Sequence, residues 1–293
     1  MADQHTGALR YPMQEFELVN VDSGVKSLRS KEYGQIFHPG TGPMEEARAL
    51  YVVQQRLAER AAACEGEFVI WDVGLGAGAN AIAAVESLSQ SNARVCLHSF
   101  DKTTASMEFA LLHAAELGYI APHEMLLREL LSKGKAVIEG KSGRLEWRLH
   151  IGDFCDEIKS GRQSPPRAIF YDPYSPSVNR EMWTLEIFSL LHRRLDAGTP
   201  CLWTNYTRST AVRVTLLLAG FYVGEGCGIG EKEMTTIASN DPALIERPFD
   251  VRWLERVSRS SNAAPLRGNE ISHSGISADD FALLKAHPQF STR

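Results

Sequence analysis

Residues 68–80 read FVIWDVGLGAGAN, and this stretch decides the fold of the chain. An apolar run of strand length ends in a turn that holds Gly74, Gly76 and Gly78. Glycine lets the backbone turn sharply and brings N–H groups close to a ligand at the start of the next helix. The spacing Gly74-x-Gly76-x-x-Ala79 also satisfies the dinucleotide fingerprint, and a glycine-rich turn with no ligand has the same composition. The stretch therefore predicts a strand, a tight turn and a helix, and it leaves the ligand open.

Apolar runs of strand length recur along the chain. They cover residues 68–73, 95–100, 145–150, 168–173, 201–206, 221–225 and 234–239. Most are separated by stretches of helical period, and strands that alternate with helices form a largely parallel sheet. The last two runs are separated by GCGIGEKE, which is too short for a crossover helix, so they should pair antiparallel at one sheet edge. We predict a doubly wound α/β fold with a seven-stranded, mostly parallel sheet and an antiparallel edge strand.

Changes in pattern divide the chain into three predicted segments. Residues 1–43 hold a hairpin that turns at Asp22-Ser23-Gly24, followed by a loop that we assign to the active site. Residues 44–240 form the α/β domain, which opens with a helix from about 44 to 63. Residues 241–293 form a C-terminal arm, with a short helix around Trp253 and a polar stretch that should be a surface arm or a partly ordered tail.

Composition excludes several classes of protein. The 293 residues are 44% hydrophobic and 23% charged, as in an ordinary globular domain, and no segment approaches the ~18 apolar residues of a membrane span. Five cysteines lie far apart without a CxxC pair, which favours reduced thiols and a cytoplasmic protein over a zinc site or disulfides. The net charge of −5 gives no global attraction to nucleic acid, so an RNA contact needs a local patch. We expect no membrane or metal partner; the oligomeric state stays open, with a monomer preferred.

Acidic residues close four successive predicted strands. They are Asp72, Asp101, Asp153 and Asp172. A carboxylate at the end of the second strand can accept both ribose hydroxyls of a nucleoside, in NAD or in S-adenosylmethionine alike. A dehydrogenase predicts the first two acids but not Asp153, next to Phe154, or Asp172, whereas methyltransferases of the doubly wound class predict all four. Each aspartate alone could instead be a helix N-cap. The series predicts S-adenosylmethionine as the cofactor.

Four segments resemble, in order, the methyltransferase domain of MnmC, the bacterial enzyme that completes 5-methylaminomethyl-2-thiouridine at the tRNA wobble position. Residues 171–188, YDPYSPSVNREMWTLEIF, are similar to that family's DGFAP-x-x-N-x-x-MWT-x-x-(L/I)F signature. Residues 22–47 resemble its DGS-x-TL…YGE-x-YHS-x-x-GA-x-x-EA segment. Residues 204–223 resemble its T-Y-T…VR-x-x-L-x-x-AGF strand and helix, and residues 228–239 resemble its G-x-G-x-KREM loop.

The resemblance implies a Rossmann-like class I methyltransferase that uses S-adenosylmethionine and acts on tRNA. The residues that it places at the cofactor are Tyr33, Asp72, Gly74, Gly76, Gly78, Asp101, Asp153, Phe154 and Asp172. Those that it places at the acceptor are His38, Lys232 and Met234, with Asp172 and Tyr174 as the catalytic pair. The chain holds no second domain of flavin-enzyme length, so we expect a stand-alone form that performs only the final methylation.

Several positions on the acceptor side depart from the family pattern. Asp-Gly-Phe-Ala-Pro is Asp172-Pro173-Tyr174-Ser175-Pro176 here, Tyr-His-Ser is Phe37-His38-Pro39, and the KREM arginine is missing, which leaves Lys232-Glu233-Met234. Methyl transfer is therefore better supported than the identity of the acceptor. A methyltransferase for a small-molecule or protein amine stays an alternative, as do an NAD-dependent oxidoreductase and a domain that only binds the cofactor.

Methyl transfer from a sulfonium is an in-line displacement, so the protein positions the reactants and manages the charge of the acceptor. An amine must be neutral when it attacks, and Asp172, with Tyr174 beside it, is the first candidate to accept its N–H bond. His38 can take up a proton near neutral pH but a lone histidine is more often structural, and Lys232 contacts the acceptor or is a solvated loop charge. Basic side chains that could bind RNA, or form a charge-balanced surface, are Arg180, Arg193, Arg194, Arg208, Arg213, Arg247, Arg252, Arg256 and Arg259.

Overall fold

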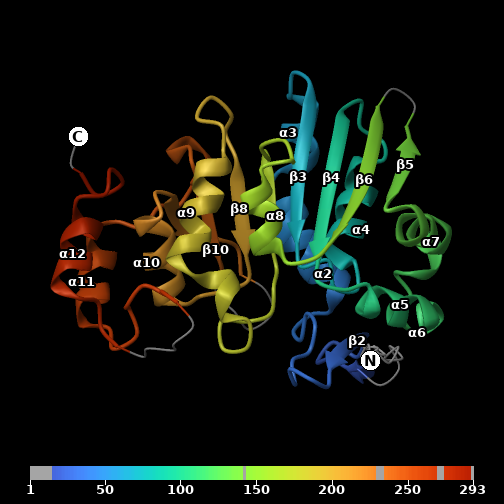
Figure 1. Ribbon diagram of the computed structural model, residues 1–293, viewed down its shortest axis with the longest axis horizontal. Coiled ribbons are helices and arrows are strands. Elements are labelled where there is room, and N and C mark those ends of the chain that lie inside the picture. The colour runs from blue at the N-terminus through green and yellow to red at the C-terminus, as the bar shows by residue number, and fades with distance from the viewer. Residues whose placement is uncertain (1–14, 141–142, 229–233, 269–273, 292–293) are drawn as a thin grey trace, which may run out of the picture.

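The computed structural model describes residues 15–140, 143–228, 234–268 and 274–291. Its centre is an eight-stranded sheet with the order β5-β6-β4-β3-β7-β8-β10-β9 (Figure 1). The strands are β3 (Glu67–Val73), β4 (Arg94–Asp101), β5 (Lys135–Glu139), β6 (Arg144–Ile151), β7 (Ala168–Tyr171), β8 (Leu202–Asn205), β9 (Tyr222–Glu225) and β10 (Thr236–Ser239). Neighbours from β6 to β8 run parallel, which confirms the doubly wound, mostly parallel sheet.

The prediction of seven strands is wrong by one, because β5 pairs antiparallel with β6 at a sheet edge. The sequence of β5 is KAVIE, with charged residues at both ends, and it follows a helix that ends at a left-handed Gly134. This apolar run is so short that its alternation of apolar and polar residues cannot be distinguished from the helical pattern before it. Toward the other edge, β10 pairs antiparallel with β9, as the short connection between the two runs predicted.

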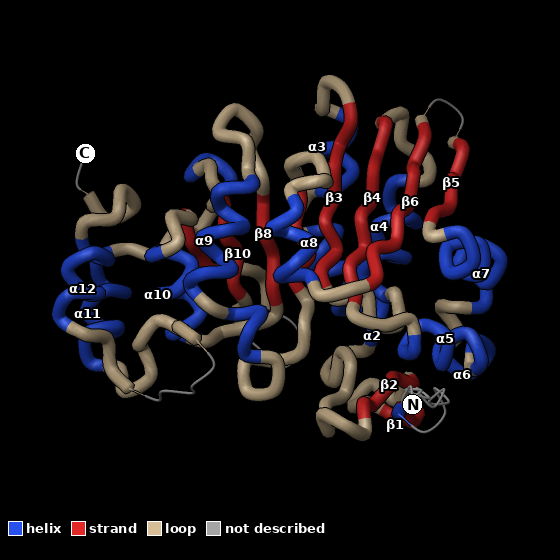
Figure 2. Tube along the Cα trace, viewed as in Figure 1, coloured by secondary structure: helices blue, strands red, loops and turns tan. Residues whose placement is uncertain are grey.

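Helices cover both faces of the sheet and bury two hydrophobic cores (Figure 2). They are α2 (Pro43–Ala47), α3 (Leu57–Ala62), α4 (Ala79–Leu88), α5 (Ala105–Leu112), α6 (Ala114–Leu117), α7 (Glu124–Lys133), α8 (Phe154–Ser160), α9 (Leu185–Arg194), α10 (Thr210–Leu218), α11 (Val251–Arg259) and α12 (Ala278–Lys285), with 3₁₀ turns η2 (Ala121–His123), η3 (Arg180–Trp183) and η4 (Pro242–Leu244). Alternate residues of β3 supply both cores, since successive side chains of a strand point to opposite faces. Trp71 packs with residues of α8, α9 and α10, and Ile70 packs with residues of α3, α4 and α7.

The predicted helix from 44 to 63 is interrupted. It consists of α2, a π-helical turn η1 (Arg48–Val53) and α3, with Arg56 in the left-handed region at φ 48°. The break turns the fully buried Gln55 toward the sheet, where its amide donates to the carbonyl of Leu202 at 3.0 Å. The helical spacing of apolar residues could not predict this break, because the break allows a contact with a strand that lies far along the chain.

The N-terminal hairpin lies beyond the carboxyl ends of the parallel strands (Figure 1). Its strands β1 (Phe16–Asn20) and β2 (Lys26–Ser30) pair antiparallel around the turn at residues 21–25, which confirms the predicted hairpin. Phe16 and Leu28 are buried in the core that also holds α4 and α5. The hairpin is therefore packed against the sheet edge at which open α/β folds bind ligands.

The segment after residue 240 is more closely packed than the sequence predicted. The helix expected around Trp253 is α11, and it lies with α12 at one end of the molecule, beyond α10 (Figure 1). Instead of a polar surface arm, the described residues place Val257, Ala263 and Leu284 in the core with no exposed surface. These apolar residues are scattered along the sequence, and they meet in one core because the chain folds back on itself. In the described part of the chain, no helix has the length and apolar character needed to cross a membrane.

Candidate active site

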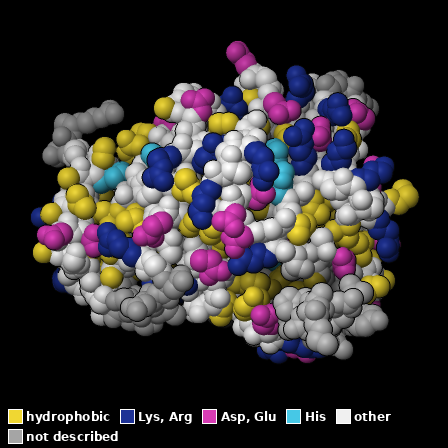
Figure 3. Space-filling model, in the orientation of Figure 1, with side chains coloured by type: hydrophobic (Ala, Val, Ile, Leu, Met, Phe, Trp, Pro, Cys, Tyr) yellow, Lys and Arg dark blue, Asp and Glu magenta, His cyan; other side chains and the backbone are white. Residues whose placement is uncertain are grey.

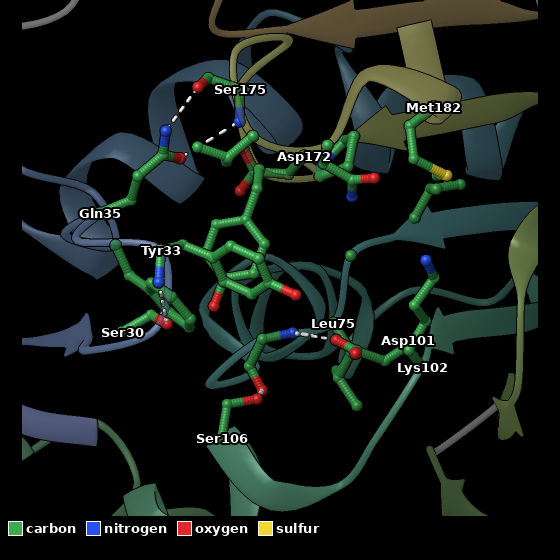
Figure 4. A pocket seen from close by; sticks show the side chains of 18 of the residues that line it. Ser30, Tyr33, Gln35, Leu75, Asp101, Lys102, Ser106, Asp172, Ser175 and Met182 are labelled. Carbon is green, nitrogen blue, oxygen red and sulfur yellow. Dashed lines mark hydrogen bonds between the residues drawn. The ribbon is translucent and has the colours of Figure 1, made fainter. Parts of the chain in front are cut away.

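A cavity of about 480 Å³ opens where β3, β4 and β7 end and where the N-terminal hairpin covers the sheet (Figure 4). Its lining combines the glycine turn with the ends of the strands and with the loop after β2. The predicted site residues that line it are Tyr33, His38, Gly74, Gly76, Asp101, Phe154, Asp172 and Tyr174. The topology thus brings together most of the residues that the sequence selected.

The glycine turn comes close to two other segments of the cavity wall. A Cβ on Gly74, whose φ is +93°, would lie 2.6 Å from the carbonyl oxygen of Asp172. A Cβ on Gly76, whose φ is +54°, would lie 3.2 Å from the ring of Phe37. We call the turn around Gly74 and Gly76, together with Asp101, the cradle. The turn requires glycine at both positions, for space and for backbone conformation. Gly78 is different: it starts α4, faces Met107 and does not line the cavity.

Asp101, at the end of β4, faces the cavity across from the loop after β7. Its carboxylate accepts the N–H of Gly76 at 2.9 Å and that of Thr103 at 3.3 Å. Burial raises the pKa of this carboxyl, although the N–H bonds oppose the shift. A carboxylate has about four lone-pair sites, so Asp101 can still accept bonds from a ligand.

Asp72 lies behind the residues that line the cavity, and its assignment to the cofactor stays a prediction. It is fully buried, does not line the cavity, and accepts a bond from the hydroxyl of Ser99 at 2.7 Å. That hydroxyl in turn accepts the indole N–H of Trp147 at 2.9 Å. Burial raises the pKa of Asp72 to about 8, with the charge of Asp172 adding to the shift and Ser99 opposing it. The residue is part of the support of the site.

Asp153 has a structural role, and its assignment to the cofactor stays a prediction. It caps α8, accepting the N–H of Cys155 at 2.8 Å, and its other oxygen lies 3.4 Å from the ammonium of Lys102. It does not line the cavity, so the N-cap interpretation of this residue holds. The next residue, Phe154, does line the cavity, and its ring packs edge-on against Phe100 at 5.2 Å.

Asp172 and His38 meet at the opposite side of the cavity from Asp101. The Nε2 of His38 lies 3.7 Å from the carboxylate of Asp172, and its Nδ1 lies 3.7 Å from that of Glu46. The amide of Asn80 donates to Asp172 at 2.7 Å. Burial raises the pKa of Asp172, while His38 and Asn80 lower it. The fully buried Tyr51 is close enough for Asp172 to raise the pKa of its phenol, after burial as the larger cause.

Aromatic side chains and one amide join the N-terminal loop to the loop after β7. The ring of Tyr174 lies 4.6 Å from that of Tyr33 and 5.6 Å from that of Phe37, between centroids. The amide of Gln35 donates to the hydroxyl of Ser175 at 2.5 Å and accepts its backbone N–H at 3.2 Å (Figure 4). We call this pair of hydrogen bonds the Gln35–Ser175 clamp. It makes the hairpin loop a wall of the cavity.

The loop before β10 is only partly described. Met234 is half-buried and does not line the cavity, so the structure does not support its assignment to the acceptor. Lys232 lies outside the described residues. Within the described ranges, no three His, Cys, Asp or Glu side chains come together as a metal ion would require.

Comparison with known proteins identifies the class of enzyme. Residues 121–241 match the model of a family of S-adenosyl-L-methionine-dependent methyltransferases. The structure superposes on MnmC2 from Aquifex aeolicus with a TM-score of 0.67 and 27% identity, covering 94% of this chain and 84% of the other. The chain is an S-adenosylmethionine-dependent methyltransferase. Its cofactor is S-adenosylmethionine, as the acidic series predicted.

This methyltransferase is also similar to part of a larger bifunctional protein. The tRNA 5-methylaminomethyl-2-thiouridine biosynthesis bifunctional protein MnmC of Pseudomonas fluorescens Pf0-1 is 29% identical over 212 residues, which are 70% of this chain and 32% of that protein. The MnmC of Chromobacterium violaceum is 29% identical over 244 residues, which are 78% and 36%. The chain thus spans about a third of the length of these relatives.

The sequence did not reveal several polar residues of the methyltransferase site. They are Gln35, Glu46, Tyr51, Asn80 and Ser175. Glu46 and Tyr51 belong to a segment that was predicted only as an amphipathic helix, and Asn80 follows the glycine turn inside the quoted stretch. The one available signal was that Gln35 stands where the family's YGE segment has Glu, and Ser175 where its DGFAP segment has Ala. Because the two changed residues are hydrogen-bonded to each other in the structure, the two changes form an interacting pair.

Proposed function

We propose that this methyltransferase transfers the methyl group of S-adenosylmethionine to the aminomethyl nitrogen of a wobble uridine in tRNA. The observation that carries the proposal is that one cavity holds a nucleoside-type cradle at Asp101 and a carboxylate–imidazole pair at Asp172 and His38. The likeness to MnmC, named for biosynthesis of a methylaminomethyl uridine in tRNA, supports the choice of acceptor.

The cradle fits the nucleoside part of the cofactor. The open lone pairs of Asp101 suit the two ribose hydroxyls, and the backbone around Gly74 and Gly76 leaves space for a ligand at the start of α4. Phe154 and Gly152 offer an apolar surface for the adenine, and Tyr33 lines the same cavity with its ring against Tyr174. When bound, the cofactor supplies an electrophilic methyl group on a sulfonium.

The acceptor end lies two strands away from the cradle. β3 lies between β4, which ends at Asp101, and β7, which precedes Asp172, so the two carboxylates are attached to the sheet at points about 10 Å apart. That separation leaves room for the reacting atoms between them. In-line transfer requires the amine to approach the methyl group from the side opposite to the leaving sulfur. With the cofactor held at Asp101 and the amine held at Asp172, the two groups face each other in this direction.

The carboxylate of Asp172 accepts an N–H bond of the neutral amine and directs its lone pair toward the methyl group. Because burial raises the pKa of Asp172, its carboxylate is also a better proton acceptor than a solvated one. His38 lies between Asp172 and Glu46, and its ring nitrogens can hold the proton that the methylated amine releases. Tyr174, two residues after Asp172, lines the same cavity with its ring against that of Tyr33, and this aromatic pair can shield the amine from water.

A small-molecule amine is the second candidate acceptor. The observation that favours it is that Pro39 and Pro173, which replace a serine and a glycine of the family pattern, both line the cavity. A proline ring is larger than the side chain of serine or glycine, so these positions leave less room for the acceptor, whereas Gly74, Gly76 and Asp101 match the family pattern. The cofactor and the chemistry are the same for both candidates.

The experiment is transfer of labelled methyl groups to bulk tRNA from cells that lack the final methylation step, with fully modified tRNA as the control. We expect incorporation only into the undermethylated tRNA, and nuclease digestion should place the label on a methylaminomethyl uridine. Equal labelling of the two tRNA samples would contradict the tRNA acceptor. Cofactor binding, measured separately by calorimetry, tests the cradle without reference to the acceptor.

A further inference from the structure

A second hollow lies beside α11, at the end of the molecule away from β5 (Figure 1). Its lining residues include two aromatic rings, Phe249 and Trp253, which stack at 4.6 Å with an interplanar angle of 14°. Its basic lining residues are Arg247, Arg252, Arg256 and Arg259, and its acidic ones are Glu225, Asp250 and Glu255. We call this hollow the arginine groove.

Three of the arginines form one stripe on α11. Arg252, Arg256 and Arg259 are spaced i, i+4 and i+7, so they share one face of the helix, and all three are exposed. The other face buries Trp253 and Val257 in the core. The core contact fixes the direction in which the stripe faces, as a rigid binding surface requires.

The positive charge of the groove is not neutralised by contact. Of the carboxylates in the described ranges, none lies within 4.0 Å of a guanidinium nitrogen of the four groove arginines. Asp250 is engaged in capping α11, accepting the N–H groups of Arg252 at 3.0 Å and Trp253 at 3.2 Å. Elsewhere many arginines are paired, such as Arg48 with Glu86 at 2.8 Å. The face shown in Figure 3 accordingly mixes acidic and basic side chains.

A buried cation, Arg213, packs against one ring of the groove. Arg213 is only 7% exposed; it donates to Thr236 Oγ1 at 3.0 Å and to the carbonyl of Thr235 at 2.9 Å, and its guanidinium lies 4.9 Å from the ring of Phe249. Its pKa is lowered to about 10, first by burial, then by the charges of Arg208 and Arg256, with Glu225 opposing. Arg208 is exposed just past the end of β8, two residues after the cavity-lining Tyr206.

The groove and the cavity share the carboxyl edge of the sheet. β9 ends at Glu225 in the groove and runs in the same direction as β7, since both β8 and β9 pair antiparallel with β10. Three strand steps separate β7 from β9, a distance of about 14 Å. A duplex carries one charge per ~1.7 Å of its axis, so several phosphates of a nucleic acid that enters the cavity fall within this distance.

We propose that the arginine groove binds the phosphate backbone of the tRNA whose acceptor base enters the cavity. The inference rests on the proposed function, and it assigns the docking surface that the net charge of −5 does not provide. Arg247 and Arg259 each donate to a backbone carbonyl, of Gly226 at 3.2 Å and of Glu255 at 3.1 Å, and keep further N–H groups for a ligand. Arginines without a carboxylate partner on a rigid face suit phosphates, which accept bidentate guanidinium bonds. The two rings of the groove are buried in the core, so they hold α11 in place and the arginines make the contacts.

The test is the salt dependence of tRNA binding by the full chain. The groove variant is Arg252→Gln/Arg256→Gln/Arg259→Gln, and the control is Arg94→Gln/Arg144→Gln/Arg162→Gln, which removes the same charge at residues outside the groove and the cavity. We expect the groove variant to bind tRNA roughly 10- to 100-fold more weakly near physiological salt, with a plot of log affinity against log salt that is flatter by about 2 to 3. The KM for tRNA should rise while kcat stays constant, because these contacts hold substrate and transition state alike.

Both variants should keep the melting temperature and the cofactor affinity of the unaltered chain, so a loss of binding reports the surface. Equal tRNA affinity and equal salt slope in the groove variant and the control, in a chain that still methylates tRNA, would overturn the groove assignment alone. An unaltered chain that neither binds nor methylates tRNA would instead overturn the proposed function, and the groove assignment with it. Loss of polyglutamate binding in the groove variant with tRNA binding unchanged would assign the groove to an acidic protein and overturn the proposal.

Discussion

Asp101 and Asp153 are two acidic residues at neighbouring strand ends with different surroundings. Asp101 lines the cavity, whereas Asp153 caps a helix and lies outside the lining. Replacing Asp101 by Ala should weaken cofactor binding roughly 10- to 100-fold in a calorimetric titration, because about two charge-assisted hydrogen bonds are lost.

Asp153→Ala is the matched control for that titration. It should cost about 1 kcal/mol of unfolding free energy, as for a lost helix cap, and change the cofactor dissociation constant by no more than a few-fold. A larger loss of cofactor affinity in Asp153→Ala than in Asp101→Ala would reverse the two assignments.

Asp172→Asn tests the acceptor end of the cavity. The amide is nearly isosteric, so the variant should fold and bind the cofactor, while kcat should fall by about 100-fold, as for one lost positioning group. The carboxylate is the active form, and its pKa is raised by burial. In the unaltered chain kcat should therefore decline as the pH falls through that raised pKa. A variant with full kcat, or one that shows the same acidic decline, would show that another group titrates.

Asp72 makes a contribution to stability that depends on pH. In the folded chain its pKa is about 8, whereas the unfolded value is 3.8, so the folded state binds the proton more tightly. Stability from this group is thus complete below pH 3.8 and is lost as the pH rises toward 8. Asp72→Asn removes this loss, so urea unfolding should show a stability advantage of the variant that grows across that window. A constant difference between the two proteins at all pH values would mean that Asp72 does not titrate there.

At the scale of elements, α12 shows how a polar tail segment is held on the domain. Leu284 has no exposed surface, whereas its neighbour Leu283 is 62% exposed. Leu284→Ala should lower the free energy of unfolding by about 2–5 kcal/mol, through the lost burial and the cavity left behind. Leu283→Ala should change it by no more than about 0.5 kcal/mol. Equal, small effects in denaturant titrations would indicate that α12 is not docked in solution.

Elements were predictable where one local pattern determined them. The seven apolar runs became strands because each is long and apolar enough to occupy a buried position between helices. β5 was missed because an edge strand needs few apolar residues. The break at Arg56 was missed because it depends on Gln55 reaching the sheet, and a hydrogen bond to residue 202 leaves no trace in a periodicity of 3.6.

At the scale of the whole molecule, the site was predictable only in part. Asp101 and Asp172 follow strands, and the parallel topology alone places strand ends at one edge. His38 could be listed as a candidate, but its position between Glu46 and Asp172 depends on how the hairpin folds over the sheet. The arginines of α11 were visible as charges, whereas their common face required the helix and its buried side.

The Gln35–Ser175 clamp has a consequence for synthesis of the chain on the ribosome. Its partners are 140 positions apart, so the loop that holds Gln35 cannot form this contact until the segment around Ser175 has been translated. The nascent hairpin should therefore stay undocked until then. We expect the cofactor to protect the cradle against protease only after the loop that follows β7 has left the exit tunnel. Early fragments of the nascent chain cannot sequester the cofactor, and the enzyme becomes competent to bind it in a single late step.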